Sequence, residues 1–289
     1  MSEADRLTVP FGRAAEATPE EADAPAAASR WRRAEPTIFG LAGIGFALIL
    51  WEAVPYLVTM KAGTKLFFTP PSQVATTLWQ LFASGAIWDP LGVSAAGFAV
   101  GLGVAVLVGL PLGILIGRSE TLNALFEPFI TAFNATPRIV FLPLLVLWFG
   151  LGLWSKVVIV AIGAVFPLLI NTHEGIRNSD RLLINVVRSF GAREWDVIRL
   201  VVVPNALPYI IAGFRLAIGR AVIGVVLAEF FGSDQGLGVM MVQAASQYKV
   251  NVVFAGMIVF MTLSLAMTGV VKIVEKRLGR WRPQRAASE

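Results

Sequence analysis

Long apolar runs alternate with short polar stretches over most of the chain. A transmembrane helix needs about 20 predominantly apolar residues to cross the hydrocarbon core, and six stretches of the sequence reach about that length. The pattern therefore predicts an all-α membrane protein with six transmembrane helices. The predicted spans cover about residues 37–58, 91–117, 126–150, 155–173, 206–231 and 252–274.

The third of these spans contains residues that disfavour a continuous helix. Pro128, Pro137 and Pro143 fall within it, and Arg138 lies near its middle. Proline removes a helical hydrogen bond and clashes with the preceding turn, so each one favours a kink or a break. The alternative to one continuous span is an interfacial helix near 120–135 followed by a short span.

Two polar or amphipathic segments are expected on the outer face of the membrane. The segment 72–84 predicts an amphipathic helix, with Ser72 as its N-cap. The loop 232–249 is rich in glycine and carries Asp234 and Gln235. A protein that delivers a substrate could contact either segment.

Basic residues at the ends of the spans predict the orientation of the chain. They cluster before the first span, after the second, after the fourth and at the end of the sixth. Because cytoplasmic loops carry the excess of Lys and Arg, both termini are expected to be cytoplasmic. The predicted organisation is a disordered cytoplasmic tail at 1–35, a membrane domain at 36–275 and a basic cytoplasmic tail at 276–289.

Composition supports the membrane assignment and excludes several kinds of chemistry. Hydrophobic residues make up 56% of the chain and charged residues 15%, and the mean hydropathy is +0.71, whereas soluble proteins carry about 25% charged residues. The net charge of +5 comes from basic residues beside apolar runs, so it does not indicate nucleic-acid binding. With no cysteine and one histidine, disulfides, thiolate metal sites and Cys/His catalysis are excluded. We expect no metal and no cofactor.

The chain also lacks the sequence elements of an enzyme that uses nucleotides. No G-x-x-x-x-G-K-[ST] phosphate-binding loop occurs, and no Ser/His/Asp set or paired-carboxylate arrangement is found. His173, the single histidine, lies where the fourth span ends, and an interfacial hydrogen-bonding role is expected for it. The protein is therefore not expected to be an enzyme.

The second span carries a small residue at every fourth position. Close approach of backbones is the main way in which helices associate in lipid, and it requires such residues. The stripe predicts a tightly packed helix at the centre of the bundle or at a subunit interface, with pore lining as the alternative. Its members are Gly97, Gly101, Ala105, Gly109, Gly113 and Gly117.

Ionisable residues within the predicted spans are candidates for the translocation path. A charged group at the bilayer centre costs about 2.5–3.5 kcal/mol on insertion scales, so it should face protein or water. We assign Arg138, Arg220 and Glu229 to this candidate path, with structural pairing as the alternative for Glu229. Arg215 is expected nearer the cytoplasmic end, where its side chain can reach the interface.

A charged segment separates the fourth and fifth spans and carries five arginines from Arg177 to Arg199. Apolar residues up to Phe190 predict a short helix that ends at Gly191, because glycine readily adopts the left-handed conformation of a helix terminus. Trp195 begins a second apolar face, and Pro204 marks the entry to the next span. This arrangement predicts a rigid cytoplasmic knob that binds a partner. The alternative is an amphipathic hairpin on the lipid surface.

This segment resembles the cytoplasmic loop of ABC importer permeases, whose pattern is E-A-A-x3-G-x9-I-x-L-P. Gly191 and Pro204 stand at the required separation, with Val201 and Val203 at the Ile and Leu positions. The opening E-A-A is replaced by 185–187, so an acidic residue of the docking surface is missing. The resemblance makes about 174–204 a coupling loop that docks an ATPase. Its candidate contact residues are Asn185, Val186, Val187, Arg188, Phe190, Gly191, Ala192, Arg193, Trp195 and Pro204.

The resemblance extends over about residues 70–275, and within this range the sequence is similar to the nitrate/sulfonate/taurine branch of these permeases. Two groups of residues carry this similarity. The first is Pro137-Arg138, followed by Leu142-Pro143-Leu144 and by 148–152, and the second is the segment 213–217 continuing to Ala228-Glu229. It implies a type I ABC importer permease fold in the bacterial inner membrane. The implied function is import of a small solute, such as an aliphatic sulfonate, taurine or nitrate, by alternating access.

The resemblance also implies partners. These are two copies of an ATP-binding cassette subunit that hydrolyses ATP, a second permease copy in a homodimer, and an extracytoplasmic substrate-binding protein. The alternatives are an ion-coupled secondary transporter, a scaffolding membrane protein, and an ABC permease for a vitamin precursor or another small anion.

Overall fold

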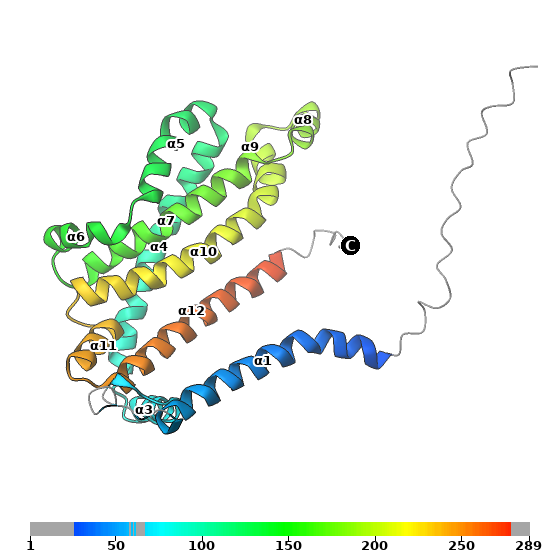
Figure 1. The fold of residues 1–289 in the computed structure, drawn as a ribbon. Helices are drawn as coiled ribbons and strands as arrows, with labels where there is room; N and C mark the ends of the chain where they lie inside the picture. Colours follow the sequence, from blue (N-terminus) through cyan, green and yellow to red (C-terminus); the bar gives the residue numbers. More distant parts are fainter. Residues whose placement is uncertain (1–25, 58, 60, 62–66, 279–289) are drawn as a thin grey trace, which may run out of the picture. The chain divides into compact units, whose positions relative to one another are not determined.

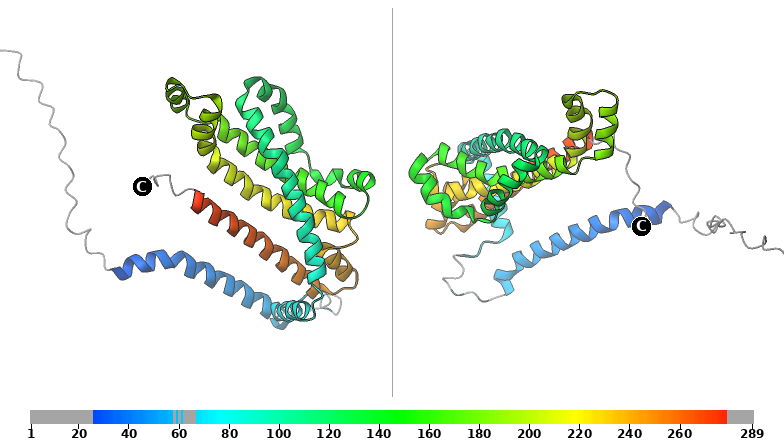
Figure 2. Two further views of the ribbon diagram at one scale, coloured as in Figure 1. Left: turned by 180° about the vertical axis from the view of Figure 1, so that it is seen from behind. Right: turned by 90° about the horizontal axis from the view of Figure 1, so that it is seen from above.

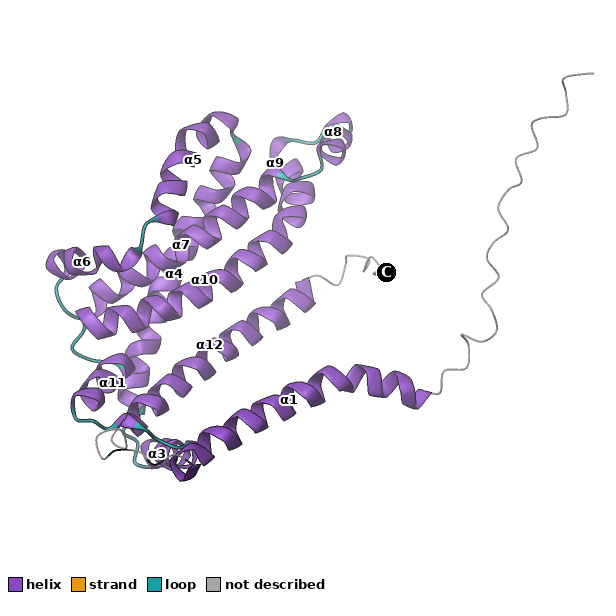
Figure 3. Cartoon of the chain, in the orientation of Figure 1, coloured by secondary structure: helices purple, strands orange, loops and turns teal. Residues whose placement is uncertain are grey.

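The computed structural model describes residues 26–57, 59, 61 and 67–278, and within these residues all regular structure is helical (Figure 3). The chain divides into two units, residues 1–59 and 60–289. The first unit contains helix α1, Ala26–Leu57, and the second contains the remaining helices.

Helix α1 carries the first predicted span. Its portion Ile38–Leu57 is long and apolar enough to cross a membrane, in agreement with the prediction of 37–58. The helix begins at Ala26, earlier than the boundary predicted at residue 36, because the alanine-rich segment before the span continues the same helix. The rest of the predicted N-terminal tail, residues 1–25, and residues 279–289 of the C-terminal tail lie outside the described residues.

Three long helices form the centre of the second unit: α4 (Trp88–Arg118), α7 (Leu153–Arg177) and α10 (Val203–Gly232). They lie side by side in Figures 1 and 2. Helices α4 and α7 run in the same direction and α10 runs in the opposite direction. We call the end of this unit at which α4 and α7 finish and α10 begins the coupling end.

The small-residue stripe of α4 packs against α7 along its length, which confirms the predicted packing role. A Cβ atom built at Gly101 would lie 2.6 Å from Val160 Cβ, and one at Gly113 would lie 2.7 Å from Thr172 Cβ. At Gly117 the corresponding distance, to Ile176 Cβ, is 2.8 Å. Real Cβ atoms do not approach so closely, so the spacing of α4 and α7 depends on these glycines.

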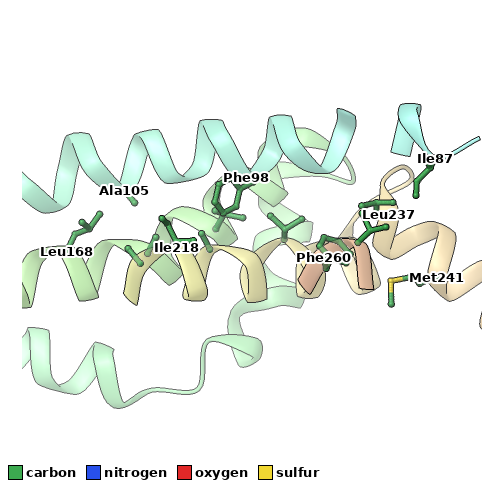
Figure 4. Close-up of a cluster of buried hydrophobic side chains, with 14 residues drawn as sticks. Ile87, Phe98, Ala105, Leu168, Ile218, Leu237, Met241 and Phe260 are labelled. Atoms are coloured by element: carbon green, nitrogen blue, oxygen red, sulfur yellow. The ribbon is translucent and has the colours of Figure 1, made fainter. Parts of the chain in front are cut away.

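A continuous apolar core joins these helices to the opposite end of the unit. Figure 4 shows Phe98 and Ala105 of α4 close to Leu168 of α7 and Ile218 of α10. The core continues into helices α11 (Leu237–Ser246) and α12 (Val250–Leu278), where Leu237, Met241 and Phe260 are buried. Helix α12 carries the sixth predicted span.

The third predicted span is broken. Helix α5 (Glu120–Ala135) is followed by a 3-10 turn, η2 (Arg138–Phe141), and the short helix α6 (Leu142–Phe149). The two helical parts meet at an angle of 82°. Pro137 lies at this break, as its missing N–H group predicts, whereas Pro143 lies in the first turn of α6, where a proline is tolerated. The helix near 120–135 is therefore confirmed, and the second unit contributes four long spans plus this bent pair.

The predicted outer helix also forms, with a different N-terminus. Helix α3 spans Pro71–Ala83, and its N-cap residue is Pro70. The prediction of Ser72 as N-cap was wrong, because Pro71 already occupies the first helical turn, where its missing N–H costs nothing. Asn251 at the start of α12 donates a 2.8 Å hydrogen bond to the Thr77 hydroxyl and joins the two helices.

Candidate functional site: the coupling loop and the charged groups of the spans

The coupling loop consists of two helical pieces joined by a tight turn. Helix α8 (Arg181–Ser189) begins at Asp180, whose carboxylate accepts hydrogen bonds from the backbone N–H groups of Leu182 and Leu183 at 2.8 and 3.4 Å. Helix α9 (Glu194–Val197) continues through the π-turn η3 (Ile198–Val202) into α10. Figure 1 shows α8 and α9 beyond the ends of α7 and α10.

Gly191 ends helix α8 in the predicted way. Its φ angle is +80°, in the left-handed region that glycine adopts without a steric penalty. Its N–H group donates a hydrogen bond to the Arg188 carbonyl at 2.9 Å, and the N–H group of Ala192 donates one to the Val187 carbonyl at 3.4 Å. These bonds satisfy carbonyls that the end of the helix leaves free.

Pro204 explains the π-turn between α9 and α10. Proline has no N–H, so the carbonyl of Leu200 loses its usual hydrogen-bond donor. The ladder shifts by one residue, and the N–H group of Val203 donates to the carbonyl of Ile198, five residues earlier. The coupling loop thereby continues into the fifth span without a flexible linker.

The coupling loop has one buried side and one exposed apolar side. Val197 and Val202 are buried against Ile176 of α7 and Ala206 of α10. On the exposed side, the side chains include Phe190, 87% exposed, and Trp195, 68% exposed. These two aromatic side chains give the exposed side an apolar surface that another protein or the lipid could cover.

Glu194 forms one ion pair within the coupling loop and one with the end of α4. The carboxylate of Glu194 lies 2.8 Å from a guanidinium nitrogen of Arg188 and 3.7 Å from one of Arg118 at the end of α4. The carboxylate of Asp196 accepts a 3.0 Å hydrogen bond from the N–H group of Arg193. These contacts join both halves of the loop and connect the loop with α4.

The structure brings the predicted docking residues together in this one loop. Asn185, Val186, Arg188 and Arg193 are exposed there, whereas Val187 and Ala192 pack inward against the buried side. Their role in binding an ATPase stays a prediction.

Of the path candidates with described side chains, Arg220 is exposed and Glu229 is buried. Arg220 lies on α10 and lines a cavity of about 340 Å³ together with Asn134 and Thr136 from the end of α5. Among the described residues, no ion pair or hydrogen bond engages its guanidinium. Arg138 lies in η2 between Pro137 and Ile139, which both line this cavity, but its side chain is outside the described part of the chain.

Glu229 occupies a different environment, away from the coupling end. Its carboxylate lies 2.6 Å from the ammonium group of Lys156, and both side chains are completely buried. The Ser94 hydroxyl and the N–H group of Gly238 each donate to the carboxylate at 2.7 Å. This network joins α4, α7, α10 and α11, so the structure favours the pairing role of Glu229, and path lining stays a prediction.

Sequence reasoning missed Lys156 and Ser94 as partners of Glu229. Lys156 is one of the buried residues in the first turns of α7. The available signal was a lysine and a glutamate at the same end of two apolar spans, because a buried charge requires an opposite one. Two glycines also leave room for Glu229, since a Cβ at Gly236 or Gly238 would collide with its side chain.

The remaining polar residues of the spans lie nearer the coupling end. Arg215 of α10 forms an ion pair with Glu275 of α12, in a half-exposed position that agrees with its predicted place near the interface. The Nδ1 atom of His173 lies 3.8 Å from the Glu174 carboxylate. Within the described residues, no group of three or more His, Cys, Asp or Glu side chains could hold a metal ion.

A family model and individual proteins match this chain. The model described as "Binding-protein-dependent transport system inner membrane component" matches residues 109–280. A protein named as a putative aliphatic sulfonates transport permease from Bacillus subtilis (strain 168) is 33% identical over 235 residues, which are 81% of this chain and 84% of that protein. The taurine transport system permease protein of Escherichia coli (strain K12) is 28% identical over 257 residues, which are 87% of this chain and 92% of that protein.

Solved structures of transporters share the fold. A chain of the MetNI methionine ABC transporter, determined in inward-facing conformations, has a TM-score of 0.57 and 19% identity. The match covers 67% of this chain and 97% of that chain. The predicted type I ABC importer permease fold is confirmed.

Proposed function

This chain belongs to the family of binding-protein-dependent transport system inner membrane components, the multi-pass permease subunits of ABC importers, and from that premise we propose how it is driven and what it carries. Its coupling loop docks a separate ATPase subunit, and two permease copies with two ATPase copies form the transporter. A binding protein outside the membrane delivers an aliphatic sulfonate such as taurine. ATP binding then alternates the access of the path between the two sides.

The observation that carries the proposal is the geometry of the coupling loop. It exposes Phe190 and Trp195 while its other side is buried against the ends of α7 and α10. A partner that covers the aromatic surface can therefore move both helices as one body, because η3 joins the loop directly to α10. The absence of a phosphate-binding loop from the sequence supports hydrolysis by a separate subunit.

The proposed cargo rests on the relatives and on Arg220. The two relatives described above are named for aliphatic sulfonates and taurine. Arg220 lines a cavity among the spans, and no described residue forms an ion pair or hydrogen bond with its guanidinium. A guanidinium binds an oxyanion with two parallel hydrogen bonds, which suits a sulfonate group.

Docking is tested by co-purification of the permease with an ATP-binding cassette subunit of the same organism. Gly191→Trp is expected to abolish the complex, because a bulky side chain at φ +80° distorts the docking surface. The matched control is Gly150→Trp, since Gly150 also has a positive φ, of +73°, and equally open space around it but lies outside the coupling loop. If both variants keep the complex, or if both lose it, the result contradicts the proposed docking site.

Cargo is tested by uptake into proteoliposomes that contain the whole transporter and its binding protein. Taurine uptake is expected to require ATP and to stop when ATP is depleted under a maintained ion gradient. Arg220→Gln is expected to lower uptake about tenfold, as loss of one charge-assisted contact of about 1.4 kcal/mol would, and Arg220→Lys to retain part of it. Uptake of a pyrimidine vitamin precursor in place of taurine would instead support the alternative cargo.

A further inference from the structure

A polar cavity of about 580 Å³ opens at the coupling end. It lies between the corner where α4 meets α5 and the coupling loop, and the end of α7 also lines it. The cavity is separate from the cavity beside Arg220, which involves the other end of α5. Neither docking by the exposed aromatic residues nor the proposed path uses it.

Cationic side chains outnumber anionic ones in its lining. Arg118, Arg177, Arg181 and Arg188 line the cavity together with two carboxylates, Glu120 and Glu194. Both carboxylates are already paired: Glu194 lies 2.8 Å from Arg188 and 3.7 Å from Arg118, and Glu120 lies 3.8 Å from Arg181. The guanidinium of Arg177 has no ion pair or hydrogen bond among the described residues. The cavity therefore holds an excess of positive charge.

A buried, unsatisfied nitrogen lies in the same wall. The Nε2 atom of His173 is inaccessible to solvent and has no hydrogen-bond partner within the described structure, and His173 lines the cavity. A buried polar atom without a partner costs about 1–3 kcal/mol. An oxygen acceptor in the cavity would receive a hydrogen bond from an Nε2–H group and remove that cost once the imidazole ring turns toward the cavity.

We propose that this cavity binds a tetrahedral oxyanion at the cytoplasmic end of the permease, held by Arg177 and Arg181 with His173. The oxyanion is a free sulfate or phosphate, or the phosphate of an anionic lipid head group, since basic pockets between spans on the cytoplasmic side suit both. Arg118 and Arg188 belong to the same lining and hold Glu194 of the coupling loop. Occupancy therefore competes with the attachment of the loop, a consequence that rests on the proposed docking function.

Binding is measured on the full chain, without the ATPase, so that its outcome is independent of docking. Inorganic sulfate is titrated into the purified protein in neutral detergent by calorimetry, at constant ionic strength set with potassium chloride. Saturable binding is expected. Arg177→Gln is expected to weaken it about tenfold, equivalent to about 1.4 kcal/mol.

Arg199→Gln is the matched control, because Arg199 is an exposed arginine of the same coupling loop that does not line the cavity. It is expected to leave the affinity unchanged within about twofold, a difference of about 0.4 kcal/mol. A second test variant, His173→Phe, keeps an aromatic ring and removes the nitrogen, and it is expected to weaken binding as well. Equal affinity in all variants, or no saturable binding, overturns the proposal and leaves the arginines to balance the negative ends of α4 and α7.

The two sources of the oxyanion are separated in nanodiscs. If the lipid phosphate is the occupant, sulfate binding is lost in discs of phosphatidylglycerol and present in discs of phosphatidylcholine. Native mass spectrometry then shows phosphatidylglycerol retained on the wild type and released from Arg177→Gln. If a free oxyanion is the occupant, sulfate binds equally in both kinds of disc. Either result supports the site. The site is contradicted if the wild type and Arg177→Gln retain phosphatidylglycerol equally and sulfate binds in neither kind of disc.

Discussion

The permease holds charged residues in opposite ways at its two ends. Away from the coupling end, Lys156 and Glu229 form an ion pair from which water is fully excluded. At the coupling end, the Glu194 carboxylate pairs with Arg188 and Arg118, and all three side chains remain between 42% and 61% exposed. The first pair is enclosed by four helices, and the second attaches a projecting loop to the bundle.

The difference indicates which charges hold the fold together and which remain available. Burial of an ion pair costs several kcal/mol per ion in desolvation, so removal of one partner alone from the Lys156–Glu229 pair is expected to be strongly destabilising. An exposed pair contributes about 0–1 kcal/mol and can exchange partners. The buried pair therefore suits a rigid joint, whereas the exposed pairs suit the movement that we propose for the coupling loop.

The largest effect is expected from breaking the buried pair. Glu229→Gln leaves the Lys156 ammonium buried without an opposite charge, and removal of one partner of a buried pair costs about 3–5 kcal/mol. We expect a large fall in the thermal unfolding temperature of the detergent-solubilised protein, measured by intrinsic tryptophan fluorescence. The double variant Lys156→Met/Glu229→Leu should recover much of the loss, because no unpaired charge remains. If the single variant is as stable as the wild type, the pair is not a structural joint.

A smaller but still substantial loss is expected from the α4–α7 interface, which connects the two ends. Gly113→Val forces a Cβ into Thr172 and the Leu169 carbonyl, at 2.7 and 2.8 Å, and overpacking of this kind costs about 1–3 kcal/mol. Gly103→Val is the matched control, because Gly103 lies on the same helix with nothing within 4 Å of its Cβ position. The same unfolding measurement should separate the two variants, and equal losses would contradict the packing role of the stripe.

These two predictions also mark where sequence reasoning succeeded and where it did not. The spans, the stripe of α4 and the stop at Gly191 follow from local rules. The spans follow from the length of apolar runs, the stripe from the spacing of small residues, and the stop from the ability of glycine to adopt a left-handed φ. The Lys156–Glu229 pair joins two residues that are 73 positions apart in the sequence and lie on different helices, so neither span alone predicts it. The break between α5 and α6 was predictable from Pro137, but its 82° bend depends on packing around it.

At the coupling end, the turn of the loop provides the next test. Gly191→Ala places a Cβ at φ +80° with nothing within 4 Å, so the cost comes from the backbone alone. That cost is about 1–2 kcal/mol for a residue with a side chain in the left-handed region. We expect a small fall in unfolding temperature and a several-fold weaker complex with the ATPase in pull-down titrations. A full-strength complex would show that the docking surface tolerates a change at its turn.

The smallest effect on stability is expected from the exposed pairs themselves. Glu194→Gln removes the ion pair with Arg188 inside the loop and the ion pair with Arg118 of α4, and exposed pairs contribute about 0–1 kcal/mol each. The unfolding temperature should therefore stay close to that of the wild type, in contrast to Glu229→Gln. ATP hydrolysis by the assembled transporter should nevertheless respond less to the loaded binding protein, because the loop is no longer attached to α4. A variant that unfolds as early as Glu229→Gln, or that couples normally, would remove the distinction between a rigid buried joint and an exposed, exchangeable attachment.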